Sequence, residues 1–196
     1  MNQSSSANRH LDVHVRMAPI AQLHTALSAL ASEITGLTNL HLTHACASCG
    51  SSQHGRPVVR GGADGVTASL PGVSLSRPRV GDQGVVAVCT GAQVGIDLEA
   101  TGAASFPGFD SVAPHPQEHC HNDDDRTRLW VRKEALLKAH GTGLVTDPRS
   151  VHLSPSGAVL EGPAGTVIDV DLRPDWCCSV AITPAVGPER VNVRLH

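Results

Sequence analysis

The sequence has very few aromatic residues. Among its 196 residues, tyrosine is absent, and phenylalanine and tryptophan occur twice each. A hydrophobic core must therefore be built from valine, leucine, isoleucine and alanine, and the chain is long enough for one core or two small lobes. Single-stranded nucleic acids stack on aromatic side chains, and a net charge of −3 creates no basic field. We therefore expect no nucleic-acid partner.

Long apolar runs are also missing. No segment approaches the roughly 20 apolar residues of a membrane-spanning helix, so we expect no membrane partner. The N-terminal segment Met1 to His10 is polar and lacks the apolar stretch of a signal peptide. This predicts a disordered beginning and a cytoplasmic protein, which we expect to be a monomer.

The six cysteines do not form the pattern of a disulfide framework, and without an export signal we expect reduced thiols. Cys46, Cys49 and His54 could supply three ligands of a zinc site, although no fourth ligand follows. The alternative is a glycine-bracketed turn that presents Arg56, whose guanidinium suits a phosphate monoester.

Hydrophobic periodicity indicates the secondary structure. Apolar residues at helical spacing predict a helix over residues 20–34, ended by Thr35-Gly36, and a second helix from about 127 to 140, ended by Gly141. Apolar or alternating stretches predict strands at 40–43, 73–75, 84–89, 94–98, 151–153, 166–172 and 177–182.

Residues 101–125 contain several prolines and glycines, which predicts an irregular, lid-like insertion. The triplet Asp123-Asp124-Asp125 could be a metal cluster, or Asp125 or a neighbour could cap the second helix. The run His119-Cys120-His121 could ligate a metal, or it could be incidental in a histidine-rich chain.

Two carboxylates stand in an otherwise apolar predicted strand. Asp97 and Glu99 are two residues apart, so both side chains leave the same face of a strand, although acidic residues are rare in strands. Glu134 and Lys138 are neighbours on one face of the second helix. Three carboxylates suit Mg²⁺, which usually works with substrate phosphates, and a lysine suits a phosphate charge. The alternative for the helix is a solvated amphipathic face with a Glu–Lys pair.

Lys133 and Lys138 are the only two lysines of the chain. The segment Ser74-Leu75-Ser76-Arg77-Pro78 places two hydroxyls and a guanidinium at the end of a predicted strand. It could be an ordinary turn or a second edge that contacts phosphate.

These segments together resemble the Sfp-type 4′-phosphopantetheinyl transferases. The family's G-[IV]-D-[IL]-E strand matches residues 95–99, and its W-x-x-K-E-A-x-x-K-A-x-G-x-G helix matches 130–143. The pattern C-x2-C-G-x3-H-G-[RK]-P matches 46–57, and S-[LV]-S-H-S falls on 74–78. Phe109 and Glu118 stand where members often have the same residues. The resemblance covers about residues 23–182.

The resemblance implies an α+β fold of two similar lobes with coenzyme A in the cleft between them. Residues 1–92 would form a shortened N-terminal lobe, and residues 93–196 a C-terminal lobe with the metal and catalytic motifs. The implied reaction transfers the 4′-phosphopantetheine arm of coenzyme A, the substrate, to a serine of an acyl or peptidyl carrier protein. Such members tend to serve polyketide or nonribosomal-peptide biosynthesis. The alternative is a catalytically weak or inactive paralogue that binds coenzyme A or a carrier protein.

The resemblance also implies roles for single residues. Asp97, Glu99 and Glu134 would hold Mg²⁺ against the pyrophosphate of coenzyme A. Glu134 would also accept the serine proton, and Lys138 would neutralise charge on the transferring phosphate, as positioning and charge neutralisation dominate phosphoryl transfer. The residues expected to contact coenzyme A are Arg56, Ser76, Arg77, Lys138 and Arg16.

The sequence departs from the family pattern at three of the positions compared. Arg77 replaces the histidine of S-[LV]-S-H-S, Pro78 replaces its last serine, and His24 stands where an arginine is common. An arginine binds phosphate but does not titrate near neutral pH. We therefore expect Arg77 to act as a permanent cation.

Overall fold

The structure is a computed structural model that describes residues 10–46, 49–61, 68–70, 72–78 and 81–196. The segment predicted to be disordered lies, apart from His10, outside these residues. Within the described part, the helices are α1 (Leu23–Thr35), α2 (Phe109–Val112) and α3 (Asp123–His140). Short 3₁₀ turns occupy Ile20–Gln22, Gly143–Val145, Pro148–Ser150 and Pro188–Arg190.

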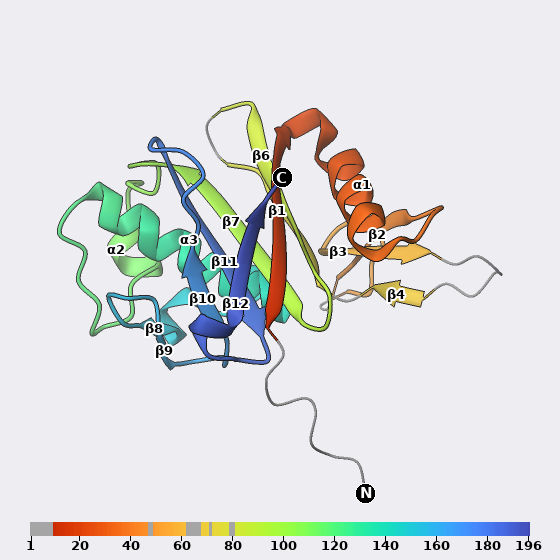
Figure 1. The fold of residues 1–196 in the computed structure, drawn as a ribbon. Coiled ribbons are helices and arrows are strands. Elements are labelled where there is room, and N and C mark those ends of the chain that lie inside the picture. Colours follow the sequence, from red (N-terminus) through yellow and green to blue (C-terminus); the bar gives the residue numbers. More distant parts are fainter. Residues whose placement is uncertain (1–9, 47–48, 62–67, 71, 79–80) are drawn as a thin grey trace, which may run out of the picture.

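The strands are short and form several sheets, which confirms the α+β class (Figure 1). In chain order they are β1 (Leu11–Pro19), β2 (His41–Ala45), β3 (Arg56–Gly61), β4 (Ala68–Leu70), β5 (Val73–Ser76), β6 (Gln83–Cys89), β7 (Gln93–Ala100), β8 (His152–Leu153), β9 (Val159–Glu161), β10 (Thr166–Asp169), β11 (Trp176–Thr183) and β12 (Val191–Leu195).

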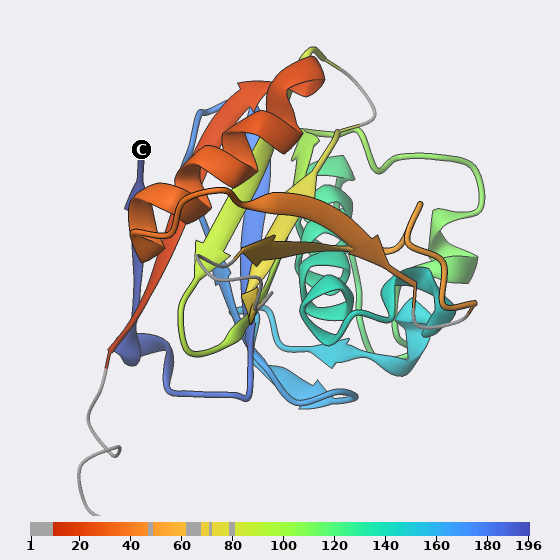
Figure 2. The same cartoon turned by 90° about the vertical axis from the view of Figure 1, so that its right-hand side faces the viewer.

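Two sheets form the centre of the molecule. One has the order β12-β1-β6-β5 and the other the order β10-β11-β7, while β2-β3-β4 and β8-β9 are smaller sheets. Inward residues of β1, β6, β7 and β11 share one aliphatic core, which includes Val15, Val85, Ile96 and Val180. Helix α1 packs on the first sheet and α3 on the second, at opposite sides of the central strands (Figures 1 and 2).

The first predicted helix is confirmed. Helix α1 follows the 3₁₀ turn and buries Leu23, Leu27 and Leu30, three positions of the predicted apolar stripe. It ends at Gly36, whose φ of 71° is the left-handed conformation typical of a glycine stop.

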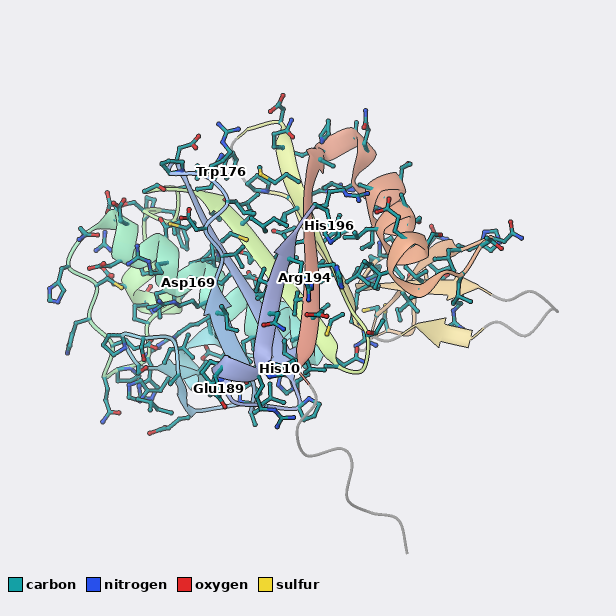
Figure 3. The ribbon with its side chains drawn as sticks, viewed as in Figure 1. His10, Asp169, Trp176, Glu189, Arg194 and His196 are labelled. Atoms are coloured by element: carbon teal, nitrogen blue, oxygen red, sulfur yellow. The ribbon has the colours of Figure 1, made fainter. Side chains whose placement is uncertain are left out.

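Strands β1 and β12 were not predicted, although both show a clear signal. In each of them apolar and polar residues alternate, as in Leu11-Asp12-Val13-His14-Val15. The two strands pair in parallel, and Arg194 Nε lies 3.0 Å from Asp12 Oδ1. Figure 3 labels Arg194 and His196 at this edge of the sheet. The C-terminal segment thus joins the sheet of β1, while the division of the chain at residue 92 and the similarity of two lobes stay predictions.

The segment 101–125 is mostly irregular up to Asn122, as its composition predicted, but it is packed against helix α3. It contains α2 and packs Phe106 and Phe109 against Trp130 of α3, with ring centroids 5.7 and 6.5 Å from that of Trp130. Phe109 is only 1% exposed. Three of the chain's four phenylalanine and tryptophan residues meet here, and the burial of their large apolar surface holds the segment in place.

Helix α3 begins earlier than predicted. Asn122 is its N-cap and accepts a hydrogen bond of 2.8 Å from Asp125 N. The triplet Asp123-Asp124-Asp125 fills the first turn, where negative charge complements the helix dipole. The helix ends at Gly141, as predicted.

Strand β7 and helix α3 approach each other unusually closely at Gly95. A Cβ atom at this position would lie 1.9 Å from Ala135 O and 2.4 Å from Ala139 N. Both atoms belong to the backbone of the helix, so no side-chain rearrangement could make room. The glycine of the strand motif therefore permits the close approach of the helix backbone at Ala135 and Ala139.

We predict that Gly95→Ala lowers the free energy of unfolding by about 1–3 kcal/mol or more, because an added methyl in a packed contact forces the elements apart. Chemical denaturation measures this change. The matched control is Gly165→Ala, where the nearest atom is Leu136 Cδ1, the end of a side chain rather than backbone, and a smaller loss is expected. Equal stability of the Gly95→Ala variant and the parent would contradict the close packing.

Candidate functional site

The acidic strand turns its carboxylates toward helix α3. Along β7, Ile96 and Leu98 point into the core between the sheets, so Asp97 and Glu99 lie on the opposite face with Gly95. Both carboxylates are buried, with Asp97 4% and Glu99 5% exposed. Charged side chains are rarely buried without partners, so this face is a strong candidate for a site.

Lys138 of α3 reaches across to this strand. Its Nζ donates hydrogen bonds to Asp97 Oδ1 at 2.6 Å, to Ser76 Oγ at 3.2 Å and to Ile96 O at 3.3 Å. Ser76 Oγ itself donates to Asp97 Oδ1 at 2.7 Å. The structure thus brings Ser76, Asp97 and Lys138 together from three elements that are distant in sequence.

The serines of β5 join the two central sheets at this point. Ser74 Oγ accepts a hydrogen bond of 3.1 Å from Ile96 N, directly beside the contact of Ser76 with Asp97. Both serine side chains are buried. The segment that was predicted to be either a turn or a phosphate-contacting edge therefore contributes its two hydroxyls to the contact with β7.

The charges around Lys138 are unbalanced. Burial lowers the pKa of Lys138, but the negative charges of Asp97, Glu134 and Glu99 outweigh this effect and raise its pKa above the ordinary value. Three carboxylates around one ammonium leave two negative charges. In addition, Asp97 Oδ2 is buried and has no hydrogen-bond partner among the described residues. A divalent cation with oxygen ligands would satisfy both conditions.

A cavity of about 500 Å³ adjoins the cluster, and Lys138 belongs to both. The residues that line it are His44, Cys46, Gly55, Arg56, Pro57, Ser74, Leu75, Lys138, Gly141, Thr142, Gly143 and Val145. Arg56 is held in the wall by a hydrogen bond of 2.7 Å from its Nη1 to Gln93 Oε1. Arg56 and Lys138 therefore present positive charge to any molecule that enters, which favours an anion such as a phosphate.

Two other predicted contacts of coenzyme A, Arg77 and Arg16, are not among the residues that line this cavity. Arg77 is exposed. The pKa of His44, a residue of the cavity wall, is lowered most by burial, then by the charge of His24 and then by the charge of Arg77. Arg16 lies on β1 and donates to both carboxylate oxygens of Glu33, at 3.1 and 2.6 Å. Arg77 therefore acts electrostatically on a residue of the cavity wall, whereas Arg16 is paired with Glu33. That either arginine contacts coenzyme A stays a prediction.

Lys133, the other lysine, has a different position that the sequence did not reveal. It is 0% exposed, and its Nζ lies 2.6 Å from Glu118 Oε2. It also donates to Ala113 O at 2.8 Å and to Pro148 O at 3.0 Å. Burial lowers the pKa of Lys133, and the hydrogen bond and charge of Glu118 oppose this shift.

Glu118 connects this lysine to the surrounding segments. Its Oε2 accepts a hydrogen bond from His115 N at 2.6 Å, and its Oε1 accepts one from Leu153 N at 2.7 Å. The ion pair thus fixes the insertion and β8 to α3. The position of Glu118 in the resemblance was the available signal, but nothing in the sequence paired it with Lys133.

Of the other metal sites that the sequence offered, the structure brings the ligands of one together. Among the described residues, ligand atoms lie within 4.8 Å of one another in two groups, Cys46-Cys49-His54 and His115-His152-Glu161. The run His119-Cys120-His121 is in neither group. All six cysteines lie in the described part of the chain, and none is in a disulfide, as predicted.

Comparison with known families identifies the segment that carries the acidic cluster. Residues 93–181 match the model of the 4′-phosphopantetheinyl transferase superfamily. This segment therefore resembles a domain of that superfamily. The matched segment includes Asp97, Glu99, Glu134 and Lys138, and it supports phosphopantetheine transfer as the general activity. No curated protein matches the chain. No helix in the described residues has the length and apolar composition of a membrane span.

We predict that Glu118→Gln destabilises the protein by about 3–5 kcal/mol, because it leaves the buried Lys133 ammonium without its counter-charge. Urea denaturation measures the loss. Adding Lys133→Met should recover part of it, since an apolar side chain needs no counter-charge. The control, Glu161→Gln, changes an exposed carboxylate and should have little effect. A loss below about 1 kcal/mol for Glu118→Gln would show that the pair does not carry charge.

Proposed function

We propose that this protein transfers the 4′-phosphopantetheine arm of coenzyme A to a serine hydroxyl of an acyl or peptidyl carrier protein, in a Mg²⁺-dependent reaction that breaks the pyrophosphate bond and releases adenosine 3′,5′-bisphosphate. The observation that carries the proposal is the Asp97–Lys138 cluster, which lies within the matched superfamily domain and adjoins a cavity with positive charge in its wall. Carriers of polyketide or nonribosomal-peptide biosynthesis are the proposed acceptors.

The residues present fit a magnesium ion. Asp97, Glu99 and Glu134 would hold it, and the buried Asp97 Oδ2 without a hydrogen-bond partner is the atom that most requires a cation. A bound Mg²⁺ supplies neutralisation of the charge that builds up on the pyrophosphate oxygens.

The protein's own residues then have separate tasks. Lys138 already carries its proton firmly, because the carboxylates raise its pKa, so it can attract the transferring phosphate as a constant positive charge. Ser76 and Lys138 bond to Oδ1 of Asp97 and so orient the side chain, which leaves Oδ2 for the magnesium ion. Arg56 attracts a second anionic group in the cavity, and Glu134 accepts the proton of the attacking serine.

The deciding experiment is the mass of a carrier protein after incubation with this protein, coenzyme A and Mg²⁺. The added mass of one phosphopantetheine group on the carrier serine is the expected result. An unchanged carrier across acyl and peptidyl types would overturn the proposal. If coenzyme A still bound in that case, by calorimetry, the protein would be the inactive paralogue.

We predict that Asp97→Asn lowers the transfer rate by about 100-fold or more, because one charged ligand of a catalytic cation is worth several kcal/mol. The variant should also need more Mg²⁺ for half-maximal rate. Asp169→Asn is the matched control, since Asp169 is an ion-paired aspartate of the same sheet, 2.6 Å from Arg132, outside the cluster. A Mg²⁺ requirement unchanged by Asp97→Asn would remove Asp97 from the metal site.

We predict that Arg77→Ala weakens coenzyme A binding by about 10-fold or more, the loss of a hydrogen bond to a charged group. Arg77→His should be tolerated better. Independently of ligand, Arg77→Ala should raise the pKa of His44, since a nearby positive charge is removed, and NMR titration measures this shift. Arg173→Ala, at an exposed arginine paired with Asp175, is the control. Unchanged coenzyme A affinity would exclude Arg77 from the binding site.

A further inference from the structure

Two cysteines and a histidine converge beside the cavity. Cys46, Cys49 and His54 place one ligand atom each within 4.8 Å of the others. Cys49 Sγ and His54 Nε2 lie 3.3 Å apart. A tetrahedral zinc ion with ordinary Zn–S and Zn–N bonds would separate a sulfur from a nitrogen by about 3.5 Å. The observed spacing is therefore close to that of two ligands of one ion.

The backbone builds this arrangement. Gly50 N donates to Cys46 O at 2.9 Å, and Cys46 N donates to Ser51 O at 3.0 Å, so the backbone of Cys46 is bonded directly to that of Gly50 and Ser51. Gly50 lies at φ 71°, a conformation that suits glycine and reverses the chain directly after Cys49. These two hydrogen bonds hold Cys46 beside the residues that follow Cys49, and the two thiols lie near each other.

A second glycine brings the histidine back to the loop. Gly55 lies at φ 99°, and a Cβ atom there would be 2.5 Å from Ala45 O and 2.6 Å from Cys46 Cα. The chain therefore returns into direct contact with the backbone of Cys46, and His54, the preceding residue, comes with it. The two glycines of the spacing C-x2-C-G-x3-H-G therefore stand where the backbone conformation favours glycine.

We propose that Cys46, Cys49 and His54 bind a zinc ion, with water in the fourth position. Two thiolates and an imidazole form a soft ligand set that selects Zn²⁺ rather than Mg²⁺. The two thiolate charges neutralise the ion, so binding releases protons rather than burying a net charge. Cys49 and His54 are exposed, which gives the metal access from solvent.

The second group of possible ligands meets the same distance limit, but its ring geometry does not suit one shared ion. The rings of His115 and His152 are stacked almost in parallel, with centroids 4.6 Å apart and an interplanar angle of 8°. Histidine ligands bind through lone pairs in the ring plane, so two stacked rings do not aim at one point. His115 Nδ1 also accepts a hydrogen bond of 3.3 Å from Gln117 N.

The zinc ion would have a positioning role. Cys46, Gly55 and Arg56 all line the 500 Å³ cavity, and Arg56 follows the return of the chain by one residue. Metal binding would fix the loop and thereby hold Arg56 against Gln93. The proposal does not depend on the transfer reaction, because its evidence is the geometry of the loop alone.

The experiment measures metal content and ligand identity in the full chain. Protein purified without chelators is analysed for zinc by mass spectrometry, with one zinc per chain expected. Metal-free protein is then titrated with Co²⁺, and a thiolate-to-cobalt charge-transfer band with tetrahedral d–d bands is expected. Zinc should also slow the alkylation of Cys46 and Cys49 but not of Cys177, a cysteine outside the cluster.

Variants assign the ligands. Cys49→Ser and His54→Asn change exposed side chains, so the protein should stay folded by circular dichroism while zinc is lost and the cobalt spectrum changes. Cys120→Ser and Cys177→Ser are the matched controls and should retain one zinc. Absence of zinc in the parent, a cobalt spectrum without the thiolate band, or full zinc retention by both ligand variants would each overturn the proposal. The Cys49 and His54 contact would then be a thiol–imidazole hydrogen bond only.

Discussion

The contact between the backbone of β7 and that of α3 at Gly95 determines the rest of the site. A larger residue would separate strand and helix, since its Cβ would lie 1.9 Å from Ala135 O. At the observed separation, Lys138 Nζ reaches Asp97 Oδ1 at 2.6 Å and Ile96 O at 3.3 Å. Because hydrogen bonds weaken steeply with distance, a small displacement of the helix would remove the cluster.

The second constraint is the join between the two central sheets. Ser74 and Ser76 of β5 bond to polar groups of β7, because Ser74 Oγ accepts from Ile96 N and Ser76 Oγ donates to Asp97 Oδ1 beside Lys138. The N-terminal part of the chain therefore completes a site whose charges come from the matched domain. The cavity is likewise lined by both parts of the chain, because Arg56 comes from β3 and Lys138 from α3.

The two lysines show how burial and partners decide the role of a residue type. Lys133 is wholly buried, and its ammonium contacts Glu118 and two backbone carbonyls. All three contacts hold protein segments together. Lys138 is 28% exposed and faces three carboxylates, so its charge is stable and accessible from the cavity. A buried pair costs desolvation and contributes mainly position, whereas a part-exposed cation remains available to a ligand.

By itself, the sequence determined the features that depend on local order. The periodicity of α1, the glycine stop of α3, the common face of Asp97 and Glu99, and the neighbours Glu134 and Lys138 all follow from residue spacing along a helix or strand. Only the tertiary structure decided the contacts between distant segments: β12 beside β1, Glu118 against Lys133, the packed segment 101–125, and His54 beside Cys49. Residue spacing carries no information about which buried faces meet. That choice depends on how the whole chain satisfies its apolar surface and buried charges at once.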